Sequence, residues 1–139
     1  ALIAIINGPN LNMVGKRQPD IYGKVGFDEF IPKLKNRYPQ HDIVYLQSNT
    51  KAGLLRIQEY GFKAEGIILN AGGYTHTSVA LADAVAAVLC RVVEVHISNI
   101  LEREPFRHHS YLSPVCAHTI MGLGLDGYTN AVEWLFPGP

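Results

Sequence analysis

The stretch LIAIINGPNLN, residues 2–12, decides the fold. Its first half is a run of aliphatic residues, and polar and turn-forming residues follow directly from Asn7 onward. A short run that is apolar on both faces is typical of a strand buried in a parallel sheet. In open α/β sheets, ligands bind outside the carboxyl ends of the strands. The segment therefore predicts the first strand of such a sheet, followed by a loop that takes part in binding.

The rest of the chain repeats this pattern. Four further apolar runs, rich in β-branched residues, predict strands at residues 43–46, 66–69, 92–95 and 119–123. Between them, apolar residues at three- and four-residue spacing predict helices at 27–38, 54–62, 79–89 and 127–136. Pro32 interrupts the first of these helices, where it would remove a backbone donor. We predict a flavodoxin-like, doubly wound parallel sheet of five strands in a three-layer α/β/α sandwich, with residues 1–139 forming one domain.

Composition restricts the classes of function. The 139 residues include 12 basic and 12 acidic side chains, and 47% hydrophobic against 17% charged residues exclude a disordered chain. A net charge of zero argues against nucleic-acid and membrane-surface partners. The longest uncharged apolar run, residues 84–90, is too short to span a membrane, and no signal peptide is visible. Cys90 and Cys116 match no metal or redox spacing, so we expect reduced thiols in a soluble, cytoplasmic protein.

Polar side chains gather at the carboxyl ends of the predicted strands. They fall at residues 7–12, 15–23, 47–49, 70–78, 96–99 and 103–110. Amides, hydroxyls, imidazoles and guanidinium groups on one edge suit a small, oxygen-rich anion. The long connection between residues 7 and 26 is typical of an active-site lid. The alternative is a set of turn formers and caps, with residues 70–73 only a turn and Thr77 or Ser78 only an N-cap.

Patterns for cofactors and metals are missing from the sequence. Gly15-Lys16 lacks the rest of a phosphate-binding loop, because Asn10 stands where a glycine is required and Arg17 where a hydroxyl is required. No GxGxxG follows the first strand, and the first loop lacks the hydroxyls expected of a flavodoxin. The histidines form no zinc pattern, and there is no GxSxG elbow. We therefore expect no cofactor and no metal, and acid–base catalysis is the natural class of chemistry.

His96 and Tyr22 are the candidate acid–base residues. The ordinary pKa of histidine lies near neutrality, so His96 suits either role, although a histidine at a strand end can also be a purely structural residue. Holding Tyr22 as a phenolate at pH 7 costs about 4 kcal/mol. An arginine such as Arg17, about 4 Å away, offsets roughly this amount only where water is excluded. Taken on its own, a tyrosine such as Tyr22 is more often a packed loop residue than a base.

Taken together and in order, these loops resemble those of the type II 3-dehydroquinate dehydratases, the type II dehydroquinases of the shikimate pathway. The resemblance runs from about residue 5 to residue 133 and rests on residues 7–12, 15–23, 47–49, 70–78, 94–99 and 103–114. It implies dehydration of 3-dehydroquinate to 3-dehydroshikimate, on the way to aromatic amino acids. The expected reaction is an anti elimination through an enolate, without a metal or Schiff base.

The resemblance also implies roles for individual residues. Tyr22 would abstract the proton beside the ketone, with Arg17 lowering its pKa. Asn10 would position a water molecule that stabilises the enolate. His96 would protonate the departing hydroxyl, with Glu94 nearby in support.

Further residues match substrate and assembly positions of the family. The substrate-binding matches are Asn70, His76, Ile97, Ser98 and Arg107, with the carboxylate held largely by Ile97 and Ser98. Arg103 matches an arginine associated with the lid. The family typically forms homododecamers, tetramers of trimers, and Asp83 matches a residue that reaches a neighbour's site.

The sequence departs from the usual family pattern at Gln18, Ala82, Leu101 and Pro32, and at residues 50–52. None of these positions is a matched catalytic residue, so they bear on the lid and on subunit contacts. Two other readings stay open from the sequence alone. One is a flavodoxin-like module that binds FMN or another nucleotide. The other is a catalytically silent homologue that keeps the polar edge without turnover.

Overall fold

Five parallel strands form the centre of the molecule in a computed structural model that describes residues 1–15 and 25–138. The strands are β1 (Leu2–Asn7), β2 (Asp42–Gln47), β3 (Gly66–Asn70), β4 (Arg91–His96) and β5 (His118–Met121). Their order in the sheet is β2-β1-β3-β4-β5, and every neighbouring pair is parallel. This arrangement confirms the predicted flavodoxin-like α/β fold.

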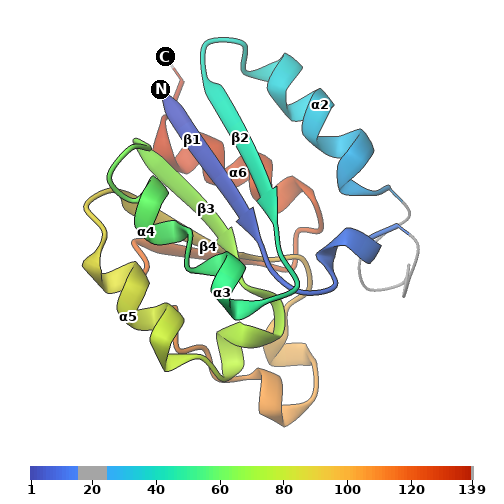
Figure 1. Ribbon diagram of the computed structural model, residues 1–139. Coiled ribbons are helices and arrows are strands. Elements are labelled where there is room, and N and C mark those ends of the chain that lie inside the picture. Colours follow the sequence, from blue (N-terminus) through green and yellow to red (C-terminus); the bar gives the residue numbers. More distant parts are fainter. Residues whose placement is uncertain (16–24, 139) are drawn as a thin grey trace.

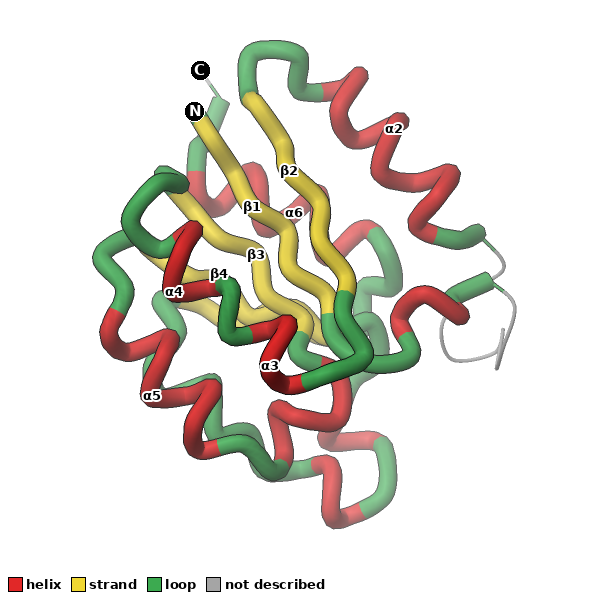
Figure 2. The backbone as a smooth tube through the Cα atoms, in the orientation of Figure 1, coloured by secondary structure: helices red, strands yellow, loops and turns green. Residues whose placement is uncertain are grey.

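Helices cover both faces of the sheet, as Figures 1 and 2 show. On one face lie α2 (Phe27–Arg37) and α6 (Asp126–Leu135), and on the other lie α3 (Lys51–Leu54), α4 (Ile57–Tyr60) and α5 (Val79–Ala87). Four short 3-10 helices follow strands or lie in the loops beyond them: η1 (Leu11–Met13), η2 (Gly72–His76), η3 (Ile100–Glu102) and η4 (Pro105–Arg107). These short helices shape the edge of the sheet that the sequence marked as polar.

The alternation of side chains along β1 explains the two cores. Ile3 and Ile5 pack with α2 and α6, whereas Ala4 and Ile6 pack with the helices on the opposite face. Successive residues of a strand point to opposite faces, so a strand covered on both sides is apolar at every position. The unbroken aliphatic run therefore follows directly from the position of β1 inside the sheet.

The register of the strands brings polar residues into one row. Asn7, at the end of β1, lies opposite Gln47 of β2 and Asn70 of β3. Parallel strands that run in register also end together, so the loops that follow them share one edge. The loops at this edge form the candidate site.

Pro32 lies inside α2 without ending it, contrary to the concern raised by the sequence. Its ring is exposed to solvent, whereas Phe27, Ile31 and Leu34 are buried against the sheet. Proline removes one backbone hydrogen bond from a helix. Burial of this apolar face stabilises the helix by several kilocalories per mole, on the order of 2 kcal/mol for each large side chain, and outweighs that loss.

Two predicted elements differ from those observed. The helix expected at residues 54–62 is two short helices, α3 and α4, joined by a turn in which the Arg56 N–H donates to the Gly53 carbonyl. Gly53 is a poor helix former, and its backbone, which has no Cβ, lies against the Ser48 side chain. The strand expected to reach residue 123 ends at Met121, because Gly122 has a φ of 82° and leaves the extended conformation.

Cys90 and Cys116 are both unpaired, as predicted. Burial raises the pKa of the Cys116 thiol to about 12, and the charge of Glu94 acts in the same direction. Within residues 1–15 and 25–138, no helix is long and apolar enough to cross a membrane.

Candidate active site

A cavity of about 260 Å³ opens at the carboxyl ends of β1, β3 and β4. Eight of the predicted site residues line it: Asn10, Asn70, His76, His96, Ile97, Ser98, Arg103 and Arg107. Its apolar wall includes Leu11, Val14 and Ile100. Two arginines against one carboxylate, that of Glu104, give the lining an excess of positive charge. The cavity therefore suits a small anion with several oxygen atoms.

Asn10 holds an unusual backbone conformation at the start of this site. Its φ is 66°, the one positive value found for a non-glycine residue in the described part of the chain. Asparagine tolerates this left-handed region better than most residues do. The Asn10 N–H donates to the side-chain oxygen of Asn49, at 3.0 Å. The loop is thus fixed by backbone contacts, and the Asn10 side chain is left to the cavity lining.

The amides that follow β2 support the first loop and do not line the cavity. The Gln47 side chain donates to the Gly8 carbonyl and to the oxygen of Asn49, at 3.1 and 3.0 Å. Ser48 bonds within its own turn, to Thr50. Residues 47–49 lie at the polar edge, as predicted. Gln47 and Asn49 contact the loop that carries Asn10 and hold it in place.

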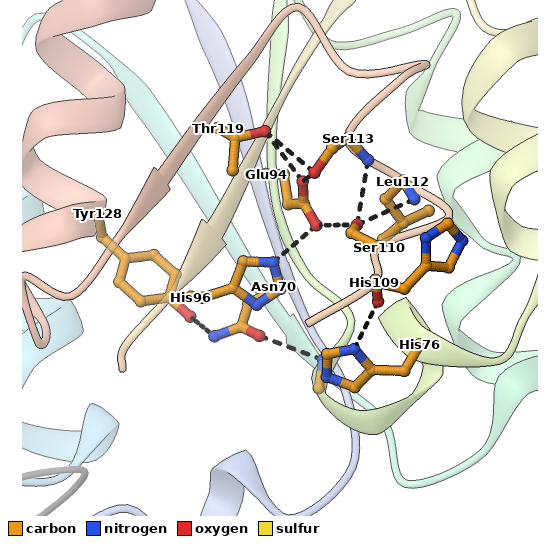
Figure 3. Close-up of polar contacts among 11 residues, drawn as sticks. Asn70, His76, Glu94, His96, His109, Ser110, Leu112, Ser113, Thr119 and Tyr128 are labelled. Atoms are coloured by element: carbon orange, nitrogen blue, oxygen red, sulfur yellow. Dashed lines mark hydrogen bonds and ion pairs between the residues drawn. The ribbon is translucent and has the colours of Figure 1, made fainter. Parts of the chain in front are cut away.

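Asn70 is held by a chain of polar groups in the interior, of which Figure 3 shows the contact with Tyr128. Its side-chain nitrogen donates to the Tyr128 hydroxyl at 3.1 Å, and that hydroxyl donates to Asn7 at 2.7 Å. Asn7 in turn donates to the Tyr45 hydroxyl at 3.2 Å, and the Asn70 oxygen accepts the Gly72 N–H. Burial raises the pKa of Tyr128 far above its ordinary value, so its hydroxyl stays protonated and can donate. The orientation of the Asn70 amide is therefore set from inside the core.

His76 projects from η2 with a defined tautomer. Its Nδ1 lies 2.8 Å from the His109 carbonyl oxygen, which can only accept a hydrogen bond. Burial lowers the pKa of His76, so the ring is neutral at pH 7 and carries its proton on Nδ1. Nε2 is then a free acceptor for a hydroxyl of a bound molecule.

Glu94 and His96 form a buried pair at the end of β4. Nε2 of His96 lies 2.6 Å from Oε2 of Glu94, and Glu94 is fully buried. Burial by itself would raise the pKa of Glu94. The hydrogen bond and charge of His96, with the hydroxyls of Ser110 and Ser113, outweigh it and lower this pKa to about 2.

This pairing determines which nitrogen of His96 can act. An ionised carboxylate only accepts hydrogen bonds, so Nε2 must carry a proton toward Glu94. Nδ1 is the ring nitrogen left to exchange a proton with a bound molecule. A histidine oriented by a buried carboxylate is a common arrangement for acid–base catalysis.

The cationic wall of the cavity comes from the segment after β4. Arg107 pairs with Glu104, and the hydrogen bond from Arg107 lowers the pKa of the Glu104 carboxyl. Arg103 reaches the Ser98 hydroxyl at 3.5 Å. His108 donates to the Arg103 carbonyl at 2.8 Å and so stabilises the turn between the two arginines.

Comparison with known proteins places this geometry in a family. The profile described as "Dehydroquinase class II" matches residues 1–136. The chain belongs to the class II dehydroquinase family. The resemblance inferred from the loop residues is therefore confirmed.

Individual relatives agree with the family match. The chain is 50% identical to a 3-dehydroquinate dehydratase of Fusobacterium nucleatum over 140 residues, covering 96% of this chain and 95% of the relative. It is 47% identical to a 3-dehydroquinate dehydratase of an Exiguobacterium species over 134 residues, covering 96% and 92%. The crystal structure of a type II dehydroquinase from Butyrivibrio crossotus has a TM-score of 0.93 and 41% identity, covering 96% of each chain.

Among the matched residues that the structure describes, Glu94 and Asp83 do not line this cavity. Arg17 and Tyr22 lie outside the described residues, as does the departure at Gln18. Asp83 is exposed on α5 and does not line the cavity of its own chain. Ala82, beside it, is buried against the sheet, which explains a small side chain there. Leu101 is exposed in η3.

The alternative prediction, that the polar residues are turn formers and helix caps, is also right for some of them. Ser78 caps α5, since its hydroxyl accepts the Leu81 N–H at 3.1 Å, and Asn99 caps η3 in the same way through Leu101. These two polar residues therefore serve the backbone. The turn at residues 70–73 serves both purposes, because it begins η2 and its glycines line the cavity.

Sequence reasoning missed the roles of Ser113, Thr119 and Tyr128. The sequence predicts Thr119 only as part of an apolar strand, yet its hydroxyl donates to Glu94 at 3.0 Å. The parallel register that pairs Thr119 with Glu94 could have indicated this contact. The sequence predicts Tyr128 only as part of a helix, and no local pattern distinguishes it from an ordinary core tyrosine. In the residues that the structure describes, no group of three or more His, Cys, Asp and Glu side chains is arranged to hold a metal ion.

Proposed function

We propose that this class II dehydroquinase dehydrates 3-dehydroquinate to 3-dehydroshikimate by anti elimination through an enolate, as a step of the shikimate pathway toward aromatic amino acids. The observation that carries the proposal is the buried hydrogen bond between His96 and Glu94. Glu94 holds the imidazole Nε2 in a cavity lined by Asn70, His76 and Arg107, which leaves Nδ1 as the exchangeable position. Relatives that carry the name 3-dehydroquinate dehydratase, at 47–50% identity, support the choice of substrate.

The proposed reaction has two steps. In the first, the Tyr22 phenolate, stabilised by Arg17, takes the proton from the carbon beside the ketone, and the electron pair of that C–H bond forms the enolate. In the second, the enolate collapses, the bond to the departing hydroxyl breaks, and His96 protonates that hydroxyl to give water and a conjugated enone. Asn10 would hold the water molecule that stabilises the enolate oxygen. The reaction needs no redox partner, since the sum of product and water equals the substrate.

The cavity lining supports the placement of the substrate. Asn70 and His76 offer a fixed amide and a neutral imidazole acceptor to hydroxyl groups. We propose that Ile97 and Ser98 hold the carboxylate, with Arg107 contributing to binding and Arg103 acting with the lid. The positive lining favours a carboxylate over a neutral sugar.

The direct test is to add 3-dehydroquinate to the purified protein in the presence of a chelator and to follow conjugated-enone absorbance. We expect a rise that the chelator does not suppress. Tyr22→Phe removes the phenolate but keeps the ring, so turnover should be abolished while calorimetry still detects substrate binding. No absorbance change in the wild type, with binding retained, would contradict the proposed reaction and favour a silent homologue.

We further propose that the protein assembles as a cytoplasmic homododecamer built from trimers, in which Asp83 reaches the site of a neighbouring subunit. Asp83 is exposed on α5 and does not line the cavity of its own chain, and both observations support this role. Sedimentation should give a mass of about twelve chains. Asp83→Ala should raise KM without changing that mass, and an unchanged KM would remove Asp83 from the site.

A further inference from the structure

The Glu94 carboxylate has an unusually complete set of hydrogen-bond donors. Oε2 accepts from His96 and from the Ser110 hydroxyl, both at 2.6 Å. Oε1 accepts from the Ser113 hydroxyl at 2.6 Å and the Thr119 hydroxyl at 3.0 Å. A carboxylate has about four lone-pair positions, and all of them are used here (Figure 3).

The direction of the hydrogen bond from Ser110 is fixed by the backbone. The Ser110 oxygen accepts the N–H groups of Leu112 and Ser113, each at 3.1 Å, so its own proton points to Glu94. Thr119 lies directly opposite Glu94 in the β4–β5 register. If the shared proton moved from His96 to Glu94, the hydrogen bond between them would persist, but the three hydroxyls would donate to a neutral carboxyl group instead of a carboxylate, and such hydrogen bonds are weaker.

We propose that Ser110, Ser113 and Thr119 are positioning residues that keep the proton shared by Glu94 and His96 on His96. The inference rests on the proposed function only for the role of His96 as the acid in turnover. None of the three hydroxyl residues lines the cavity, so they act through Glu94 rather than on the substrate.

The physical argument compares two positions of the same proton. When the shared proton is on Nε2 and Nδ1 is also protonated, His96 is an imidazolium that can release the proton on Nδ1. With the proton on Glu94, His96 is a neutral imidazole whose Nδ1–H is a far weaker acid. Burial favours the neutral carboxyl group. The three hydroxyl donors oppose that preference, since each stabilises the charged carboxylate.

Other titratable and charged groups also face the pair, and they set the background for any pH measurement. They come from η2, from the segment containing η3 and η4, and from the segment before β5: His76, Arg103, Glu104, Arg107 and Cys116. None is altered by substitutions in the hydroxyl residues. A change in the titration of the pair can therefore be assigned to the lost donors.

Thr119 offers the sharpest test, because Thr119→Val keeps the shape of the side chain and Thr119→Ser keeps the hydroxyl. We expect Thr119→Val and Ser113→Ala to raise the proton affinity of the Glu94–His96 pair about tenfold, the scale of one lost hydrogen bond to a charged group. The direct measurement is a pH titration of His96 by ¹⁵N NMR on the substrate-free protein. Thr119→Ser should return the titration toward that of the wild type.

Turnover gives an independent measurement. If His96 is the acid, Thr119→Val should lower kcat about tenfold and move the pH profile of kcat upward by about one unit, with KM nearly unchanged. A His96 titration within twofold of the wild type in both Thr119→Val and Ser113→Ala would overturn the proposal. A tenfold change in the titration of a protein that does not dehydrate 3-dehydroquinate would instead refute the proposed function and leave this inference intact.

Discussion

At the scale of single residues, the contacts around the site restrict each polar side chain to one tautomer or one orientation. His76 is held neutral with its proton on Nδ1, and His96 is held with Nε2 toward Glu94. Asn70 is oriented by Tyr128 and by the Gly72 N–H. Each restriction is made by a backbone group or a buried side chain, so these three side chains do not need to reorient when a ligand enters.

The first prediction concerns His96. His96→Ala removes the proposed general acid, so kcat should fall about 100-fold or more, the scale of one lost acid–base group. Steady-state kinetics on 3-dehydroquinate would measure this loss. A decrease smaller than threefold would exclude His96 from that role.

The second prediction concerns Tyr128. Tyr128→Phe leaves the buried Asn7 oxygen and one Asn70 N–H without their shared partner, which should lower the free energy of unfolding by about 2 kcal/mol. KM should also rise because the Asn70 amide is no longer fixed. Urea denaturation and kinetics measure the two effects. Tyr60→Phe, on the partly exposed face of α4, is the matched control and should change stability by no more than about 0.5 kcal/mol.

At the scale of elements, the loop after β1 and the start of η2 pack backbone against backbone. The Gly8 N–H donates to the Asn70 carbonyl at 2.7 Å. A Cβ on Gly8 would lie 2.4 Å from the Ala71 carbonyl oxygen, which is too close for any real contact. These two segments carry Asn10 and Asn70, so their close approach sets the width of the cavity.

Gly8→Ala tests this contact. The added methyl group must push the two segments apart, and we expect a loss of stability of about 1–3 kcal/mol together with a marked loss of turnover. Thermal denaturation and the enone assay would measure both. At Gly138 an added Cβ meets nothing within 4 Å, so Gly138→Ala is the control. Equal behaviour of the two variants would show that the contact does not shape the site.

At the scale of the whole molecule, Glu94 links the site to acid stability. Its pKa falls from 4.5 to about 2 on folding, so its stabilising contribution is present above about pH 4.5 and is lost as the pH falls toward 2. The contribution amounts to about 3 kcal/mol. This charge is therefore a part of the stability of the fold as well as of the proposed chemistry.

Comparison with Glu94→Gln isolates that contribution. Between pH 6 and pH 2, the free energy of unfolding of the wild type should fall by about 3 kcal/mol more than that of the variant. Urea denaturation at several pH values and a fixed protein concentration gives the slope of the free energy of unfolding against pH for each protein. Parallel slopes would show that the carboxylate is not specially stabilised in the folded state.

The fold was predictable because each layer has its own local pattern. An aliphatic run such as residues 2–6 and a helical face such as Phe27, Ile31 and Leu34 reflect burial directly. The candidate site was predictable to the extent that its residues follow strand ends. Thr119 and Tyr128 were not predicted, because their contacts depend on strand register and on packing between distant segments.

The backbone at Asn10 has a consequence for how this position can change. With a φ of 66°, the site accepts glycine, asparagine or aspartate without much strain, and it penalises every other side chain. Asn10→Gly would thus remove the amide and leave the loop relaxed, whereas Asn10→Ala would mix a chemical loss with a conformational one. A substitution at this position must first be compatible with the left-handed backbone, whatever its chemistry. Of the three residues that are compatible, asparagine is the one with a side chain that can both donate and accept a hydrogen bond.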